Sequence, residues 1–217
     1  MANFGFADLR VVRPYDVAFR EAVSAVGGAG VLSQAKVFDT VAEAVADCSL
    51  VVGTTAGTRR VPHVAIDRIE PVATLVKAHS GRTAILFGSE KFGLSNEDMS
   101  FCHVLARIPT MPGTPSMNLG QAVAICVYEL IRESGELTGR SAAARRSRYQ
   151  SIEGAEAEQL TGMLLEVLRM SGYTNRITAV STDQKIRRWI RRLRIGRGDA
   201  PLLLGVLRQI LWKLGKE

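Results

Sequence analysis

Two loops rich in glycine and proline carry the residues of this 217-residue chain that could do chemistry. Phe-Gly-Ser-Glu-Lys-Phe-Gly-Leu occupies 87–94, and Ile-Pro-Thr-Met-Pro-Gly-Thr-Pro-Ser-Met-Asn occupies 108–118 and leads into an apolar stretch. Glycine lets a backbone approach a ligand closely, and three prolines restrict the second loop before a ligand binds. The polar side chains in these loops are Glu90, Ser116 and Asn118. The pattern predicts a small-ligand pocket bound largely by backbone groups.

Other interpretations of the same loops remain. Ser116 or Asn118 is also a natural N-cap for the helix that follows. The first loop begins like a Walker A phosphate loop, but the position that must be lysine is Leu94. The dinucleotide pattern Gly-x-Gly-x-x-Gly after a predicted strand is also missing from the sequence. The loops therefore disfavour a nucleoside triphosphate or a dinucleotide as ligand.

The cysteines and histidines are not spaced as metal ligands, since they form neither a Cys-x-x-Cys pair nor a His-Glu-x-x-His motif. We expect no metal, buried reduced cysteines, and histidines with structural or surface roles. The residues concerned are Cys48, Cys102, Cys126, His63, His79 and His103.

The elements that position the loops alternate between apolar β-branched strands and helical stretches. This alternation predicts an α/β fold with a mostly parallel sheet covered on both faces. Thr40 and Glu43 are placed as a capping box for one helix. The predicted strands are 9–12, 35–38, 49–53, 83–87 and 104–108, and the predicted helices are 16–25, 41–47, 71–79 and 118–133.

The C-terminal part of the chain changes character. Apolar periodicity is lost over 134–156 and returns with helical spacing in 157–170, 182–194 and 201–214. We expect a domain over 1–135, a linker over 136–156 and a small helical domain over 157–217. In its middle helix the apolar side chains should face a core while the cations project. Those apolar residues are Ile186, Trp189, Ile190 and Leu193.

The net charge of +7 is concentrated in the tail. Residues 1–139 hold 12 Lys and Arg against 14 Asp and Glu, whereas residues 140–217 hold 16 against 7. Such a basic segment favours a polyanion as partner, with a solvated cationic face as the simpler alternative. No apolar run approaches the roughly 18 residues of a membrane span, and the N-terminus lacks a signal-peptide pattern. We therefore expect a cytoplasmic protein without membrane contact.

The two loops together resemble motifs 2 and 3 of the SpoU (TrmH) branch of the SPOUT RNA 2'-O-methyltransferases. FGSEKFGL resembles FGxExxGL, and IPTMPGTPSMNLGQAVAICVYE resembles IPxxxxxxSLNLxxAVxxxxYE. LRVVRP, VVGTTAGTRR and the segment IRRWIRRLRIGRGDAPLLLGVLRQILWKL are similar to the TrmJ subgroup, so the likeness covers nearly the whole chain.

The resemblance implies a SPOUT domain with a deep trefoil knot, followed by a small all-α domain. It implies S-adenosylmethionine as cofactor, bound in the knot, and a homodimer in which two subunits complete each site. Glu90, Ser116 and Asn118 would be catalytic, and the basic helix would bind RNA. The implied cofactor contacts are Thr54, Thr55, Ala56, Gly88, Ile108, Ser116, Met117 and Asn118, and the RNA contacts are Arg187, Arg188, Arg191, Arg192 and Arg194.

The family's motif 1 is not found in these 217 residues, because Met1 corresponds to a position beyond the end of that motif. In the family that motif supplies the arginine and asparagine that help the hydroxyl lose its proton. We expect cofactor loops without this group, explained by a start codon assigned too late, a truncated form or a degenerate protein. Nothing in the spacing supports Arg59 or Arg60 as a substitute. The 217-residue form should then be less stable than an extended one.

By this resemblance the expected function is tRNA ribose 2'-O-methylation, at the anticodon-loop nucleotide 32 (cytidine or uridine). An rRNA 2'-O-methyltransferase is one alternative, because the fold and motifs are shared. A non-catalytic RNA-binding homodimer without motif 1 is another, and an unrelated nucleotide-binding α/β protein is a third.

Overall fold

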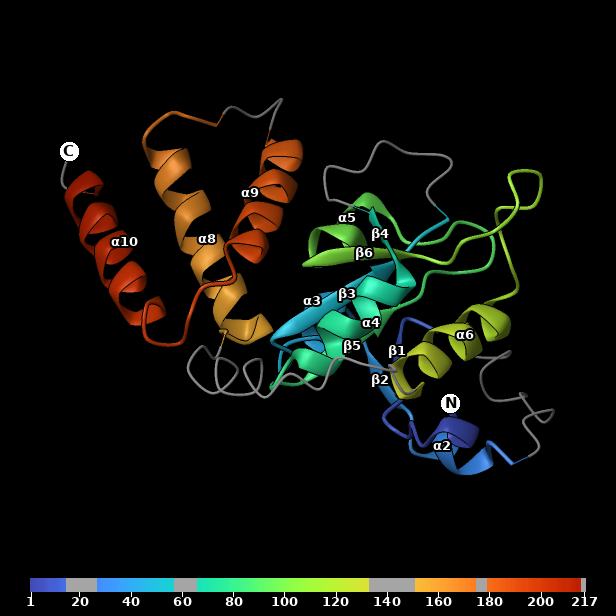
Figure 1. The fold of residues 1–217 in the computed structure, drawn as a ribbon. Coiled ribbons are helices and arrows are strands. Elements are labelled where there is room, and N and C mark those ends of the chain that lie inside the picture. Colours follow the sequence, from blue (N-terminus) through green and yellow to red (C-terminus); the bar gives the residue numbers. More distant parts are fainter. Residues whose placement is uncertain (15–26, 57–65, 133–150, 175–178, 216–217) are drawn as a thin grey trace.

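The computed structural model describes residues 1–14, 27–56, 66–132, 151–174 and 179–215. They form a sheet unit (residues 1–132) and a helical unit (residues 151–215), with the chain termini on opposite sides of the molecule (Figure 1). The sheet unit is the expected α/β arrangement with parallel strands. The predicted helix over 16–25 lies outside the described residues.

The main sheet has four parallel strands in the order β4-β6-β3-β5. Its central strand is apolar and carries Val51 and Val52, both without exposed surface, so it is covered on both faces. Register places Val52 opposite Ile85 and Val104. The strands are β3 (Leu50–Thr54), β4 (Ile66–Arg68), β5 (Thr83–Leu86) and β6 (Val104–Arg107).

A second, two-stranded parallel sheet pairs β1 (Arg10–Val12) with β2 (Lys36–Phe38). Arg10 anchors it, because its guanidinium lies 2.5 Å from Asp47 and also donates to the Ala44 carbonyl at 2.7 Å. Arg82, just before β5, lies 2.9 Å from the same Asp47. The Arg10 hydrogen bond holds the pKa of Asp47 well below its usual range.

Helices cover both faces of the main sheet, as the alternation of elements predicts. One apolar cluster joins β3 and β6 to α4 and α6, and the other joins them to α3 and α5. The capping box of α3 is present, with the Glu43 amide donating to Thr40 Oγ1 at 3.2 Å. The helices of this unit are η1 (Ala2–Phe4), α2 (Ala29–Ser33), α3 (Val41–Ala44), α4 (Ile69–Ala78), α5 (Asn96–Ser100) and α6 (Leu119–Ile131).

All three cysteines are buried in these clusters, which confirms their expected packing role. Burial raises the pKa of Cys48 and Cys102 to about 12 and that of Cys126 to about 11. Their thiols therefore stay protonated at neutral pH.

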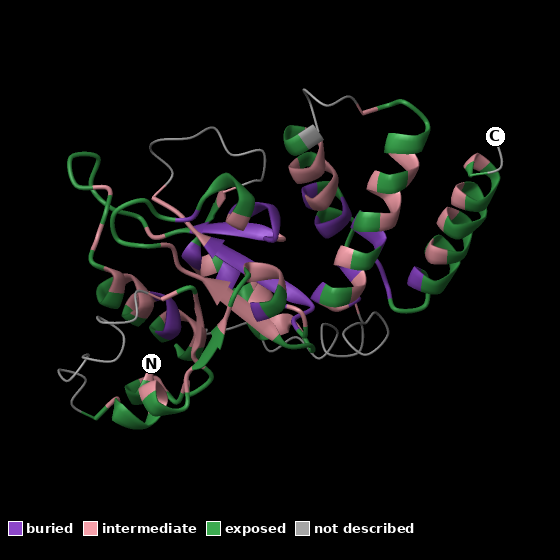
Figure 2. Cartoon of the chain, turned by 180° about the vertical axis from the view of Figure 1, so that it is seen from behind, coloured by how far each residue is buried: buried purple, intermediate pink, exposed green. Residues whose placement is uncertain are grey.

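The helical unit contains α8 (Gly154–Met170), α9 (Ala179–Leu193) and α10 (Ala200–Leu214). Leu160 and Ile190 are central to its core. Figure 2 shows how little of α10 is buried, and Ala200 is its buried residue. Helix α8 begins inside the segment predicted as linker, of which 136–150 lies outside the described residues. In the described residues, no helix is long and apolar enough to cross a membrane.

The predicted orientation of α9 is wrong for part of the helix. Ile190 faces the core as expected, but Trp189 and Leu193 are 45% and 48% exposed. Arg188 and Arg191 are instead buried, at 7% and 2% exposure. For Arg191 the reason is that α9 packs against α5 of the sheet unit as well as α8, and the face between these two helices holds Arg187 and Arg191.

Candidate functional site

The candidate site lies where parallel strands β3, β5 and β6 end. Thr54 closes β3, and its Oγ1 donates to the Leu86 carbonyl at the end of β5 at 2.8 Å. The Thr55 amide donates to the Ala106 carbonyl of β6 at 3.0 Å. These bonds fix three strand ends together, which is where open α/β sheets bind ligands. Thr58, Arg59 and Arg60, further along this loop, lie outside the described residues.

The glycine loop after β5 folds back on itself. The Gly93 amide donates to the Ser89 carbonyl at 2.8 Å, and Gly93 has a φ of +67°, which favours glycine. At Gly88 a Cβ would lie 1.9 Å from the Gly93 carbonyl carbon, so no larger residue fits. Leu94, which replaces the Walker lysine, is buried in the core and anchors the end of the loop.

The proline loop runs from β6 to α6. Thr110 Oγ1 donates to the Pro115 carbonyl at 3.3 Å and holds the loop together. Asn118 is the N-cap of α6, and its Oδ1 accepts from the Gly120 and Gln121 amides at 2.9 and 3.4 Å. The capping interpretation of Asn118 is therefore confirmed, and Ser116 is not the N-cap.

The three loops surround one cavity of about 220 Å³. The cofactor residues that the resemblance implies line it, except Asn118, and Glu90 and Ser116 line it too. Its lining residues are Thr54, Thr55, Ala56, Ile66, Phe87, Gly88, Ser89, Glu90, Lys91, Phe92, Gly93, Leu94, Met99, Ala106, Ile108, Thr110, Pro115, Ser116, Met117, Leu119 and Ala122.

The chemistry of this lining is mostly neutral. Among its described residues the ionisable side chains are Glu90 and Lys91, both exposed in the glycine loop. The described ranges hold no group of three or more His, Cys, Asp or Glu that could bind a metal ion. The cavity can therefore offer backbone groups, hydroxyls, one carboxylate and one ammonium to a ligand.

His103 and His79, at the other end of the strands, have structural roles. The Val51 amide donates to His103 Nδ1 at 3.0 Å, and the His103 amide donates to the Val51 carbonyl at 2.8 Å. Burial, together with the nearby charges of Arg191 and Arg194, lowers the pKa of His103 to about 3. His79 Nε2 lies 2.8 Å from Ser49 Oγ, and burial lowers its pKa as well.

The predicted RNA-binding arginines lie in three environments, and Arg188 is buried without an ion pair to a described residue. Arg192 and Arg194 are exposed, whereas Arg187 and Arg191 share one carboxylate, Glu158 of α8, each at 3.0 Å. Arg187 also donates to Ser100 Oγ at 3.2 Å and lies 4.6 Å from the centre of the Phe101 ring. We call Ser100, Phe101, Glu158, Arg187 and Arg191 the seam, because they join α9 to α5 and α8.

Sequence reasoning missed several lining residues. Ile66 belongs to β4, a three-residue strand with one apolar side chain that gives no periodic signal. Leu119 and Ala122 lie on the first turns of α6, where a helical pattern after the proline loop could have pointed to them. Phe92 is 73% exposed although it sits within the glycine loop, a position that the motif leaves unspecified.

A model of the SpoU rRNA methylase family matches residues 1–128. An uncharacterized tRNA/rRNA methyltransferase from Haemophilus influenzae is 38% identical over 130 residues, which are 60% of this chain and 54% of that protein. The tRNA (cytidine/uridine/adenosine-2'-O-)-methyltransferase TrmJ from Pseudomonas aeruginosa is 32% identical over 77% of this chain and 65% of that protein. The chain thus aligns with between half and two thirds of the length of these relatives.

A solved structure resembles nearly the whole chain. The crystal structure of TrmJ from Z. mobilis ZM4 superposes with a TM-score of 0.82 at 31% identity. The superposition covers 97% of this chain and 89% of that chain, so it includes both the sheet unit and the helical unit.

Proposed function

The chain belongs to the SpoU rRNA methylase family, and from this premise we propose that it methylates ribose 2'-hydroxyls of tRNA with S-adenosylmethionine as donor. The observation that carries the proposal is the single cavity formed by the motif 2 loop, the motif 3 loop and the Thr54–Thr55–Ala56 loop. The TrmJ-like relatives support tRNA as substrate class. We further propose nucleotide 32 of the anticodon loop as target and the cytoplasm as location.

The residues of the cavity fit this cofactor. Ile66, Leu94 and Ile108 provide apolar walls for a flat base, and the loop backbones provide donors and acceptors for its polar edges. The glycine loop is already closed on itself, which lowers the ordering cost of binding. The volume of the cavity, about 220 Å³, lies below the roughly 300–1,000 Å³ usual for ligand pockets. A second subunit that completes the open side would account for the difference.

When bound, S-adenosylmethionine would supply an electrophilic methyl group on a positively charged sulfur. The protein then has to align the ribose oxygen with that methyl group, and alignment alone can contribute several kcal/mol. Glu90, exposed at the cavity, can accept a hydrogen bond from a ribose hydroxyl and orient it. Ser116 offers a hydroxyl to the same space, whereas Asn118 caps α6 through its Oδ1 and does not line the cavity.

A homodimer and the trefoil knot are parts of the same proposal. Helix α6 buries Cys126 and Val127 but leaves Tyr128 and Ile131 about half exposed. These two half-exposed apolar side chains lie near the C-terminal end of the helix whose first turns line the cavity, and they favour a second copy of the chain as their cover. Sedimentation velocity of the wild type and of Ile131→Lys tests this, with a monomeric wild type as the contrary result.

The basic helical unit would bind the RNA through α9 and the residue after it, which carry the arginines at 187, 188, 191, 192 and 194. Of these, Arg187 and Arg191 are already paired with Glu158. Phosphate contacts of this kind position a substrate without reading its bases. The helical unit packs directly against the sheet unit through the seam, so RNA held there would lie in a fixed relation to the cavity.

Two measurements test the function. Calorimetry should detect binding of S-adenosylmethionine, and transfer of radioactive methyl groups to unmodified tRNA should follow, with the product located by nuclease digestion and mass spectrometry. Glu90→Gln should lower transfer at least about tenfold, with Glu97→Gln, an exposed acid of α5, as control. Methyl transfer to rRNA but not to tRNA would contradict the tRNA proposal. Binding of S-adenosylmethionine without methyl transfer to either RNA would indicate the non-catalytic dimer.

A further inference from the structure

Arg188 is a buried cation without an acidic partner. It is 7% exposed, and its Nε makes no hydrogen bond. Among the described residues no carboxylate forms an ion pair with it, and Glu158, the acid next to α9, is taken up by Arg187 and Arg191. Burial and the neighbouring Arg192 lower its pKa. A charge in this position is costly unless an anion compensates it.

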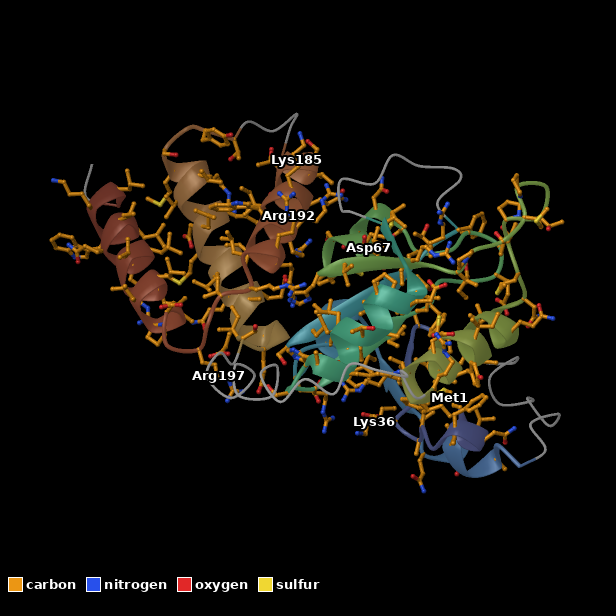
Figure 3. All side chains as sticks on the ribbon, in the orientation of Figure 1. Met1, Lys36, Asp67, Lys185, Arg192 and Arg197 are labelled. Atoms are coloured by element: carbon orange, nitrogen blue, oxygen red, sulfur yellow. The ribbon has the colours of Figure 1, made fainter. Side chains whose placement is uncertain are left out.

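The neighbours of Arg188 on α9 form a row of cations. Lys185, Arg188 and Arg192 are spaced three and four residues apart, so they lie on one side of the helix. Lys185 and Arg192 are exposed, and Figure 3 shows them one after the other along α9. The row extends about 10 Å along the helix axis. We call Lys185, Arg188 and Arg192 the cationic row.

The side chains next to the row favour a nucleic acid over other polyanions. Trp189 follows Arg188 in sequence and is 45% exposed, so its indole ring is available for stacking on a base. Arg187 and Arg191, on the neighbouring side of the helix, are held in the seam by Glu158. The cations of α9 therefore have two environments. Arg187 and Arg191 are paired with Glu158, whereas the cationic row has no ion pair with a described residue.

We propose that the cationic row binds successive phosphates of the RNA strand, with Arg188 turning outward from its buried position to a phosphate, while Arg187 and Arg191 hold α9 in place. This rests on the proposed function and assigns its RNA contacts to particular residues. When Arg188 turns, it gives up no ion pair with a described residue and no hydrogen bond at Nε, so its move to a phosphate breaks none of the seam's ion pairs. The seam stays paired in the same step.

The test is the salt dependence of binding to an unmodified tRNA transcript, measured by fluorescence anisotropy on the full chain. Each phosphate contact contributes about 0.7 to 0.9 to the slope of log affinity against log salt. Arg188→Gln should reduce the slope by about that amount and weaken binding about fivefold at moderate salt. Its melting temperature should be no lower than that of the wild type, because the variant removes an unpaired buried charge.

Arg208→Gln is the matched control, since Arg208 is an exposed cation on α10 of the same unit. It should change affinity less than about twofold. If Arg188→Gln and Arg208→Gln give the same slope, or if Arg188→Gln lowers the melting temperature by several degrees, the inference is overturned while the proposed function stands. A wild-type chain that binds no tRNA at low salt overturns both.

Discussion

The shape of the cavity at the carboxyl ends of the strands depends on close backbone contacts in its loops, whereas the seam between the two units depends on charged side chains. In the cavity, Gly88 and Gly93 bring two stretches of main chain into contact, and ionisable groups lie at the opening. In the seam, Glu158 serves two guanidinium groups, one of them nearly without exposed surface. Substitutions should therefore affect the first through steric fit and the second through charge.

Gly88→Ala should have the largest effect. Its Cβ would lie 1.9 Å from backbone atoms of the same loop, so the loop must move, at about 3 kcal/mol. Calorimetry should show at least about tenfold weaker binding of S-adenosylmethionine, while anisotropy shows unchanged binding to tRNA. Gly113→Ala, in the proline loop with no atom near the new Cβ, is the control. Equal binding of the cofactor by both variants would contradict a backbone-built site.

Glu158→Gln should disrupt the seam and leave the cavity intact. It removes the only carboxylate that pairs with Arg191 among the described residues, and a buried unpaired guanidinium costs about 2 kcal/mol after allowance for the partly exposed Glu158. Urea unfolding measures this change. Glu166→Gln, an exposed acid on the same helix, should change stability by less than about 0.5 kcal/mol. If Glu158→Gln instead weakens binding of S-adenosylmethionine and leaves the free energy of unfolding unchanged, the seam and the cavity are not separate regions.

Acid should lower the free energy of unfolding of the chain through His103, which lies just before β6. Its folded pKa is about 3 and its unfolded pKa is about 6.5, so between these values only the unfolded chain takes up the proton. The free energy of unfolding should then fall by about 1.4 kcal/mol per pH unit below pH 6.5, and the lowered pKa of His79 acts in the same direction.

Urea titrations at pH 7.5 and 5 measure this slope, and His103→Asn should reduce it. Asp47 contributes little in this window, because its lowered pKa stabilises the folded chain until the pH falls below the unfolded pKa of about 4. A free energy of unfolding that does not change between the two pH values would show that His103 is protonated in the folded chain.

Thr54→Val should have the smallest effect. It deletes the hydrogen bond from Oγ1 to the Leu86 carbonyl and should lower stability by about 1 kcal/mol. Thr54→Ser keeps the hydroxyl, so it should be more stable than Thr54→Val and should bind S-adenosylmethionine more tightly than that variant. If Val and Ser behave alike, the tie between β3 and β5 does not shape the cavity.

The strands other than β4, and the long helices, were predictable because each carries its own local signal. The apolar stretch Leu50–Thr54 and the capping box of Thr40 and Glu43 lead directly to β3 and α3. Helix α5 was missed although Ser95 and Asp98 form a capping box that the sequence displays, since five residues give no periodicity. Strand β4 depends on pairing with β6, which is a property of the folded sheet alone.

The cavity was also predictable, because glycine and proline mark backbone geometry in the sequence itself. The loops that end in Leu94 and lead to α6 therefore meet as expected. The seam was not predictable, because helical spacing alone favours cations at the surface of α9. Arg191 is buried only because α8 supplies Glu158 and α5 supplies a second packing surface, and neither is visible from the sequence of α9.

The two contacts of Arg187 differ in sequence separation, and this difference bears on the order in which they form. Its contact with Glu158 spans 29 positions within the helical unit, whereas its contact with Ser100 spans 87 positions between the units. Contacts that are close in sequence form first, and the amino-terminal unit leaves the ribosome first. We therefore expect the Arg187 contact with Glu158 to form before its contact with Ser100, so that the docking of the helical unit on the sheet unit comes late in folding.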